Sequence, residues 1–163
     1  MVDWRSASGG WRSVDEVIED TRLFQMLKVL RRVRGEIAPV LAEHGLHPGQ
    51  ELLLAQLWRE DGLTHGQLVA RLRVQPPTVT KALQRLEKAG FVRREPGDGH
   101  GRRVHLTSSG RELRVPVEQA WATADRQMLD QLSSEEQDFL GQIVSRLRNG
   151  PEQGPRRRRP TEP

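Results

Sequence analysis

The stretch from Leu63 to Thr107 constrains the fold of this 163-residue chain more than any other part of it. It opens with a short amphipathic segment over 64–72, where Thr64 and Gln67 have the spacing of a helical capping box. A longer amphipathic segment begins at 76, with two consecutive prolines where a first helical turn accepts proline. Two short β-type segments, 91–94 and 103–106, flank a turn with three glycines and one proline. Helix, turn, helix and hairpin in this order predict a winged helix-turn-helix.

The second of these helices divides into an apolar face and a polar face. Val79, Leu83 and Leu86 recur at the i, i+4 and i+7 spacing of a buried stripe. The opposite face carries hydroxyl, amide and basic side chains, which either form a solvated surface or contact duplex DNA. Lys81 and Gln84 are the predicted base readers in the major groove. The candidate DNA contacts in this helix and just before it are Gln75, Pro77, Thr78, Thr80, Lys81, Gln84, Arg85 and Lys88, of which the last two are expected at phosphates.

The first helix and the hairpin supply further candidate DNA contacts. Thr64 and His65 stand at the start of the first helix. The wing candidates are Arg93, Arg94, Asp98, His100, Arg102 and Arg103, where the arginines are expected near the DNA backbone or minor groove. Asp98 repels phosphate, so its expected role is to hold a wing arginine in place, with an exposed turn residue as the alternative.

Charge is concentrated in the same segment. Residues 71–114 carry eleven basic and four acidic residues, a net +7, whereas residues 15–70 and 115–150 each have a net charge of −3. A lone basic patch is often only a solvated surface. Because this patch coincides with the helix-turn-helix pattern, it predicts a surface that binds nucleic acid.

The flanking segments predict a mainly α fold with a small β wing. We expect a flexible arm over 1–13, a dimerisation helix over 14–45, the winged helix-turn-helix domain over 46–107, dimerisation helices over 108–149 and a disordered basic tail over 150–163. Pro39 should kink the first long helix or end it early, and Pro116 should bend a later one or start it afresh. The apolar stripes of these helices exceed what the small winged domain can cover, which predicts a homodimer.

Several classes of protein are disfavoured. The chain has no cysteine, which excludes a thiolate nucleophile and a Cys-based metal site. It also lacks the common nucleophile, phosphate-loop and zinc-protease motifs, so the hypothesis that the protein is an enzyme has little support. His44, His47, His65 and His105 are better read as ordinary loop histidines than as metal ligands. We expect no cofactor, no metal and no membrane segment, and a cytoplasmic location.

The residues from Gly45 to Gly110 resemble those of the MarR family of bacterial transcription regulators. The matching stretches are GLHPGQ, LLAQL, LTHGQLVARLRV, PPTVTKALQRLEKAGFV and the wing ending VHLT. The distance from Asp98 to Thr107 also fits the wing of that family. One position departs from its pattern: the family often has Asp-x-Arg in the wing, where Arg enters the minor groove, and this chain has His100. Arg102 and Arg103 follow closely and could serve instead.

The resemblance implies a homodimer that binds a pseudo-palindromic operator in double-stranded DNA. It also implies a pocket for a small-molecule effector between the dimerisation helices and the DNA-binding layer. Phe24, His44 and Trp58 are the candidate pocket residues, and Trp121 is a further aromatic that could line it. For the aromatic residues, apolar core or dimer interface is the alternative. The function predicted is therefore an effector-modulated, sequence-specific dimeric regulator, with an effector-independent or architectural DNA-binding protein as the alternative.

Overall fold

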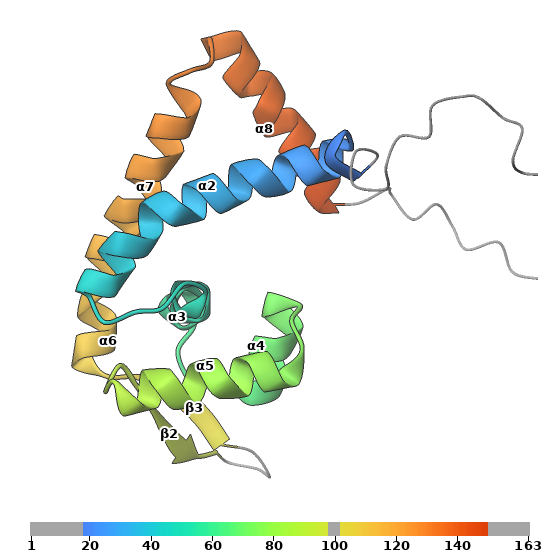
Figure 1. Cartoon of the computed structure of the whole chain (residues 1–163). Coiled ribbons are helices and arrows are strands. Elements are labelled where there is room, and N and C mark those ends of the chain that lie inside the picture. The colour runs from blue at the N-terminus through green and yellow to red at the C-terminus, as the bar shows by residue number, and fades with distance from the viewer. Residues whose placement is uncertain (1–17, 98–101, 150–163) are drawn as a thin grey trace, which may run out of the picture. The chain divides into compact units, whose positions relative to one another are not determined.

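The computed structural model describes residues 18–97 and 102–149. They fall into two compact units, which divide between Ala124 and Asp125. The predicted arm over 1–13 and tail over 150–163, and the wing residues Asp98 and His100, lie outside the described residues. Most of the helices and strands are labelled in Figure 1.

The first long helix, α2, spans Arg22–Glu43. The hydroxyl of Thr21 accepts a hydrogen bond from the backbone N–H of Phe24 at 3.2 Å, which caps the helix start. The sequence analysis was therefore wrong to expect one continuous helix from Val14, because this cap begins a new helix at Arg22. Pro39 does not end the helix, which continues for four further residues. The C-terminal half of α2 buries Ile37 and Leu41 in the core.

Three shorter helices follow and form the compact centre of the first unit. They are α3 (Gln50–Arg59), α4 (His65–Leu72) and α5 (Pro76–Lys88). The predicted capping box of α4 is present: the Thr64 hydroxyl accepts from the Gln67 N–H at 3.2 Å, and the Gln67 side chain accepts from the Thr64 N–H at 2.8 Å. Arg73, which ends α4, has a left-handed backbone with φ 52°, and this reverses the chain toward α5.

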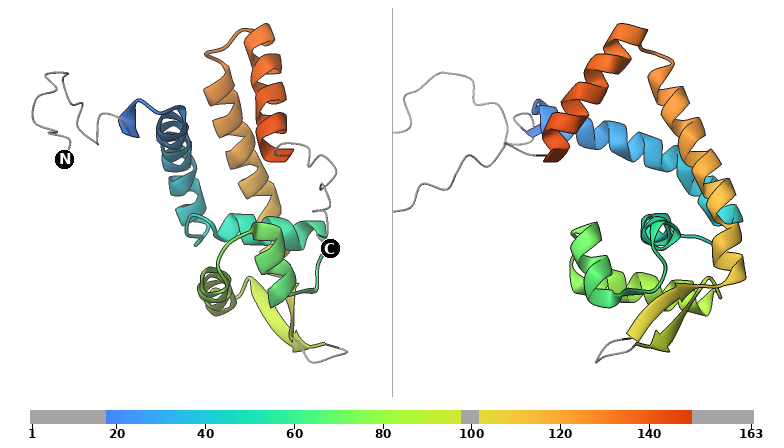
Figure 2. Two further views of the ribbon diagram at one scale, coloured as in Figure 1. Left: turned by 90° about the vertical axis from the view of Figure 1, so that its right-hand side faces the viewer. Right: turned by 180° about the vertical axis from the view of Figure 1, so that it is seen from behind.

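The wing is the outer part of a three-stranded antiparallel sheet with the order β1-β3-β2. β2 spans Val92–Pro96 and β3 spans Arg102–Leu106, and Arg94 lies opposite Val104. The sequence analysis missed the third strand, β1 (Leu63–Thr64), because two residues show no periodicity. The β2–β3 hairpin and α5 lie at the same end of the first unit in both views of Figure 2.

The core joins these elements. Its buried side chains include Leu53, Leu54 and Leu57 of α3, Leu68 of α4, Val79, Leu83 and Leu86 of α5, and Val104 and Leu106 of β3. All three residues of the predicted α5 stripe are therefore buried, each 1% exposed or less. Burying them fixes which face of α5 is left in solvent.

Two helices lead out of the sheet. α6 (Ser108–Glu112) is capped by Thr107, and α7 spans Arg114–Leu129. Pro116 lies in the first turn of α7, so it starts a helix afresh, as one of the two predicted outcomes has it. Gly110 packs so closely that a Cβ there would lie 2.0 Å from the carbonyl oxygen of Phe91.

The second unit contains the end of α7 and the helix α8 (Ser134–Asn149). Ser133 and Glu136 form a reciprocal cap, in which Glu136 accepts from the Ser133 N–H at 2.8 Å. These hydrogen bonds lower the pKa of the exposed Glu136 carboxyl. No residue of α8 is buried, and its exposed apolar side chains are Phe139, Ile143, Val144 and Leu147.

Candidate nucleic-acid interface

The exposed face of α5 is the centre of the candidate interface. Its start has Gln75 as the N-cap residue and Pro76 and Pro77 in the first turn, where the missing N–H groups of proline leave no orphan donor. Opposite the buried stripe, four of the predicted contacts are exposed: Thr78, Lys81, Gln84 and Arg85. Lys88, in the last turn, is exposed as well. The fold thus brings the predicted α5 contacts together on one surface.

The basic side chains of α5 form no ion pair and no side-chain hydrogen bond with the residues that the structure describes. Within residues 18–97 and 102–149, no carboxylate forms an ion pair with Lys81, Arg85 or Lys88. We call these three residues the basic face of α5. Because no ion pair has to be broken, they can bind phosphate or base edges at low cost.

The start of α4 lies against α5. The Nε2 atom of His65 is 3.0 Å from the hydroxyl oxygen of Thr80, which joins two of the predicted contacts across the helix-turn-helix. Thr80 is half-buried, unlike its neighbours Thr78 and Lys81. Thr64 uses its hydroxyl to cap α4, so its oxygen is already engaged at the helix start.

The wing arginines differ from the basic face of α5, since most of them already have protein partners. Arg93 is paired with Glu95. The Nε atom of Arg94 lies 3.3 Å from Oε2 of Glu87 in α5, and the Arg94 side chain is 23% exposed. Nε and Nη2 of Arg94 are buried and have no hydrogen-bond partner among the described residues, so the contact with Glu87 is an ion pair only. This position between β2 and α5 does not favour the predicted DNA contact of Arg94.

Arg102 and Arg103 are the first two residues of β3. Arg103 donates from Nη1 to the carbonyl oxygen of Gly62 at 2.9 Å, which ties β3 to the loop before β1. Arg102 is exposed, and no ion pair or side-chain hydrogen bond holds it among the residues that the structure describes. Arg102 is therefore the described wing residue best able to bind phosphate.

Asp61 anchors the wing, a role that the sequence analysis missed. Its Oδ1 accepts from the backbone N–H of Leu106 at 2.9 Å and from that of Gly62 at 2.9 Å. Its Oδ2 accepts from Nη2 of Arg111 at 2.9 Å. His105 lies nearby, with Nδ1 3.8 Å from Oδ1. An Asp-Gly pair is typical of a turn, and nothing in the local pattern points to partners 45 and 50 residues later.

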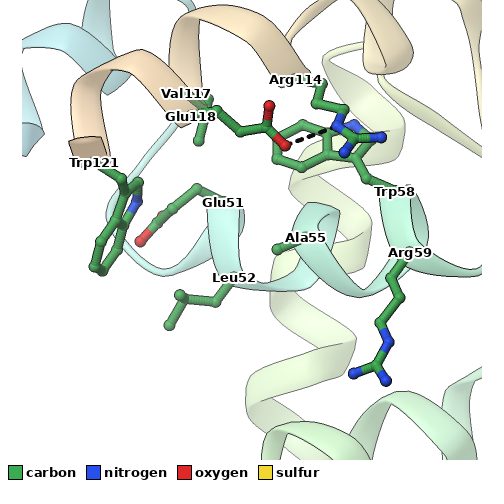
Figure 3. A pocket seen from close by; sticks show the side chains of 9 residues that line it. All are labelled: Glu51, Leu52, Ala55, Trp58, Arg59, Arg114, Val117, Glu118 and Trp121. Carbon is green, nitrogen blue, oxygen red and sulfur yellow. Dashed lines mark hydrogen bonds and ion pairs between the residues drawn. The ribbon is translucent and has the colours of Figure 1, made fainter. Parts of the chain in front are cut away.

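A pocket of about 380 Å³ lies between α3 and α7 in the first unit. Figure 3 shows Trp58 and Trp121 on its opposite sides, with Leu52 and Ala55 of α3 between them. Arg114 and Glu118 form an ion pair at its rim, with 2.7 Å between Nε and Oε1. The indole N–H of Trp58 donates to the carbonyl oxygen of Gly110 at 2.9 Å. The remaining lining residues are Glu51, Arg59 and Val117.

Of the three predicted effector residues, only Trp58 lines this pocket. Phe24 lies on α2, where the Lys28 ammonium is 5.0 Å from its ring centroid, and His44 is the C-cap residue of α2. Neither is part of the lining, so their prediction as residues of one pocket with Trp58 is not supported here. The charged lining residues were missed, because Arg114 and Glu118 are far from Trp58 in sequence and ion pairs at i, i+4 are common on any helix.

Glu51 is the buried acid of this pocket, and it is 4% exposed. Its Oε2 accepts from the backbone N–H of Gly49 at 2.6 Å at the start of α3. Burial raises the pKa of the Glu51 carboxyl, although this hydrogen bond and the charge of Arg34 lower it.

His, Asp and Glu side chains form no group of three that could hold a metal ion within the described ranges. No helix among the described residues is long and apolar enough to cross a membrane.

Comparison with known proteins agrees with this geometry. The sequence model of the MarR family matches residues 46–104. The HTH-type transcriptional regulator PecS of Dickeya dadantii is 31% identical over 113 residues, which are 66% of this chain and 68% of PecS. The chain belongs to the MarR family. Its members are transcriptional regulators that bind DNA, and this chain is a DNA-binding regulator of the MarR type.

Other MarR relatives cover more of the chain. The regulator YdgJ of Bacillus subtilis is 28% identical over 142 residues, 86% of this chain and 85% of YdgJ. Among solved structures, the crystal structure of MarR has a TM-score of 0.72 at 23% identity, and the match covers 79% of this chain and 96% of MarR, which supports the fold. The Mycobacterium tuberculosis MarR family protein Rv2887 has a TM-score of 0.63 at 25% identity. That structure is a complex with DNA, and the match covers 78% of this chain and 97% of the Rv2887 chain. Rv2887 has also been solved in complex with p-aminosalicylic acid.

Proposed function

We propose that the protein acts as a homodimer that binds a pseudo-palindromic operator and responds to a small-molecule effector. The observation that carries the DNA-binding part is the basic face of α5, since Lys81, Arg85 and Lys88 are exposed and unpaired among the described residues. In this arrangement Lys81 and Gln84 read base edges in the major groove, and Arg85 and Lys88 bind phosphates. The DNA complex of Rv2887 supports the same use of the fold.

The homodimer is supported by the apolar surface of the flanking helices. The side chains of Leu23, Leu27 and Leu30 of α2 are 51–69% exposed. Those of Phe139 and Leu147 of α8 are each 62% exposed. Apolar stripes of this extent need a partner in water, and a second copy brings a matching set. A dimer also presents two α5 helices, which matches the repeat of a pseudo-palindromic site.

The wing completes the proposed DNA contacts. In the proposed complex Arg102 contacts the backbone or minor groove, which its exposure supports. Arg103 holds β3 against the loop at Gly62. In the same proposed complex the start of α4, at Thr64 and His65, lies beside the phosphates that flank the major groove.

The effector is proposed to occupy the pocket between α3 and α7. Two tryptophans supply flat apolar walls, and Arg59, Arg114 and Glu118 supply charge at the rim. This combination suits a planar aromatic molecule with a polar substituent. The complex of Rv2887 with p-aminosalicylic acid supports a ligand of this size for a related protein. The competing function is an effector-independent DNA-binding protein.

The experiment that tests the DNA-binding proposal selects bound duplexes from random DNA with the full-length chain. We expect one enriched pseudo-palindromic sequence, a dimer by light scattering, and affinity for that sequence that falls steeply as salt rises. A monomer, or enrichment of single half-sites, would contradict the dimeric operator complex.

A second experiment separates the two functions. Aromatic ligands are titrated while tryptophan fluorescence, thermal stability and operator affinity are followed, with Trp121→Leu as the pocket variant. A ligand that stabilises the wild type and changes its operator affinity, but has no effect on the variant, supports the effector site. If no ligand changes either property, the effector-independent function is favoured.

A further inference from the structure

The hydroxyl of Thr80 is held inside the protein at two points. Its Oγ1 lies 3.1 Å from the carbonyl oxygen of Pro76, one turn earlier in α5, and accordingly donates to it. The same oxygen lies 3.0 Å from Nε2 of His65, at the start of α4. Thr80 is half-buried at this helix junction, whereas Thr78 on the same helix is exposed.

The hydroxyl proton of Thr80 is used in one of these two contacts, whichever ring nitrogen of His65 carries the imidazole proton. If Nε2 carries the imidazole proton, His65 donates to Oγ1 and the threonine proton goes to the Pro76 carbonyl. If Nε2 is unprotonated, the hydroxyl can donate to Nε2 instead. In both cases the single O–H of Thr80 points to a protein acceptor, and no donor remains for a guanine edge or a phosphate.

The methyl group is the part of the Thr80 side chain that neither contact uses, because the oxygen and the methyl carbon diverge from the β carbon. We propose that Thr80 reads a thymine through its methyl group, and that His65 is a positioning residue that withholds the hydroxyl from the DNA. A threonine methyl packs well against the 5-methyl group of thymine in the major groove. This inference rests on the proposed function and adds one base preference to it.

The role of His65 differs from that of a phosphate ligand. By holding Oγ1 from the α4 side, it fixes the side-chain rotamer of Thr80 and thereby the direction of the methyl group. Valine needs no such help, because a β-branched side chain in a helix strongly prefers one rotamer. A substitution of His65 should therefore matter when residue 80 is threonine and have no effect on the methyl contact when it is valine.

The test replaces each thymine of the selected operator by uracil, which removes only the 5-methyl group. With the wild type we expect one position in each half-site where uracil weakens binding about fourfold, as the loss of one buried methyl group predicts. Thr80→Val, which keeps a methyl and loses the hydroxyl, should retain this penalty. Thr80→Ser, which keeps the hydroxyl and loses the methyl, should abolish it. Thr107→Ser, which makes the same change outside α5 and keeps the hydroxyl that caps α6, is the matched control that retains it.

His65→Ala tests the positioning role. It should reduce the uracil penalty in the wild type and leave it unchanged in the Thr80→Val background, with the same melting temperature. An equal reduction in both backgrounds would show that His65 does not act through Thr80.

The outcomes separate this inference from the function on which it rests. If no duplex is enriched, both the operator and the thymine contact are overturned. If an operator is enriched but no uracil penalty depends on residue 80, the methyl contact alone is overturned. If Thr80→Val instead loses discrimination at a guanine, the hydroxyl donates to DNA and the proposal is wrong.

Discussion

α5 and the β2–β3 hairpin are both basic, yet their cations are held in different ways. Lys81, Arg85 and Lys88 of α5 form no ion pair within the described residues, whereas Arg93 and Arg94 of β2 are each paired with a glutamate. A paired guanidinium has to leave its partner before it binds phosphate, so equal charge does not mean equal availability. We therefore expect α5 to supply most of the free energy of DNA binding in the proposed complex, and Arg93 and Arg94 to contribute less.

The largest expected effect is on the free energy of unfolding, when the side chain of Asp61 that anchors the wing is removed. Asp61→Ala removes the acceptor for two backbone N–H groups and for Arg111. Because a hydrogen bond to a charged group contributes about 1.5–3 kcal/mol, we expect the free energy of unfolding to fall by about 3 kcal/mol. Chemical denaturation measures this change. Asp61→Asn, which keeps one acceptor oxygen, should cost clearly less, and equal losses would contradict the anchoring role.

The next effect concerns base readout by α5. Lys81→Ala should weaken binding to the selected operator about tenfold, and weaken binding to a scrambled duplex less, because a base contact is worth about 1–3 kcal/mol. Fluorescence anisotropy with both duplexes measures the ratio. Arg94→Ala is the matched control, since its side chain is turned toward Glu87. An unchanged ratio for Lys81→Ala would remove this residue from base readout.

A smaller effect distinguishes free from paired wing cations. Arg102→Ala should weaken operator and scrambled duplex alike, by a few-fold, and lower the slope of log affinity against log salt by about 1. Arg93→Ala should change the slope less, because Glu95 already neutralises Arg93. Affinities at four salt concentrations give both slopes. Equal changes in the two variants would show that pairing in the free protein does not limit the contribution to binding.

The smallest expected effect is a change in melting temperature, and it comes from the buried acid of the pocket, outside the interface. Burial raises the pKa of Glu51, so its ionised form destabilises the fold at neutral pH. Glu51→Gln keeps an acceptor for Gly49 and should raise the melting temperature slightly at pH 7. The gain should shrink as pH falls through the raised pKa of the folded state, and it should be nearly absent below the ordinary pKa of a glutamate, where the folded and unfolded carboxyls are both protonated. Differential scanning fluorimetry from pH 7 to pH 4 measures this, and a gain that persists at pH 4 would contradict it.

Local patterns predicted the helix-turn-helix well. The α5 stripe and the α4 capping box depend on residues three to seven apart, so both could be found in the sequence. The start of α2 was misplaced because an apolar period runs across Thr21, and the period outweighed the weaker capping signal.

Long-range contacts could not be predicted in this way. Asp61 reaches partners 45 and 50 residues later, and no spacing rule identifies them. The pocket has the same origin, because it joins side chains of α3 and α7 that only the fold brings together. The pairing of Arg94 with Glu87 likewise depends on how β2 packs against α5.

The exposure of α8 has a consequence for how the protein behaves on dilution. A helix of 16 residues without tertiary burial is marginal in water, since its own hydrogen bonds barely offset the entropy of ordering it. In the proposed homodimer the second copy covers α8 and stabilises it, and dilution dissociates the dimer. The far-UV circular dichroism signal per residue should therefore weaken as the sample is diluted.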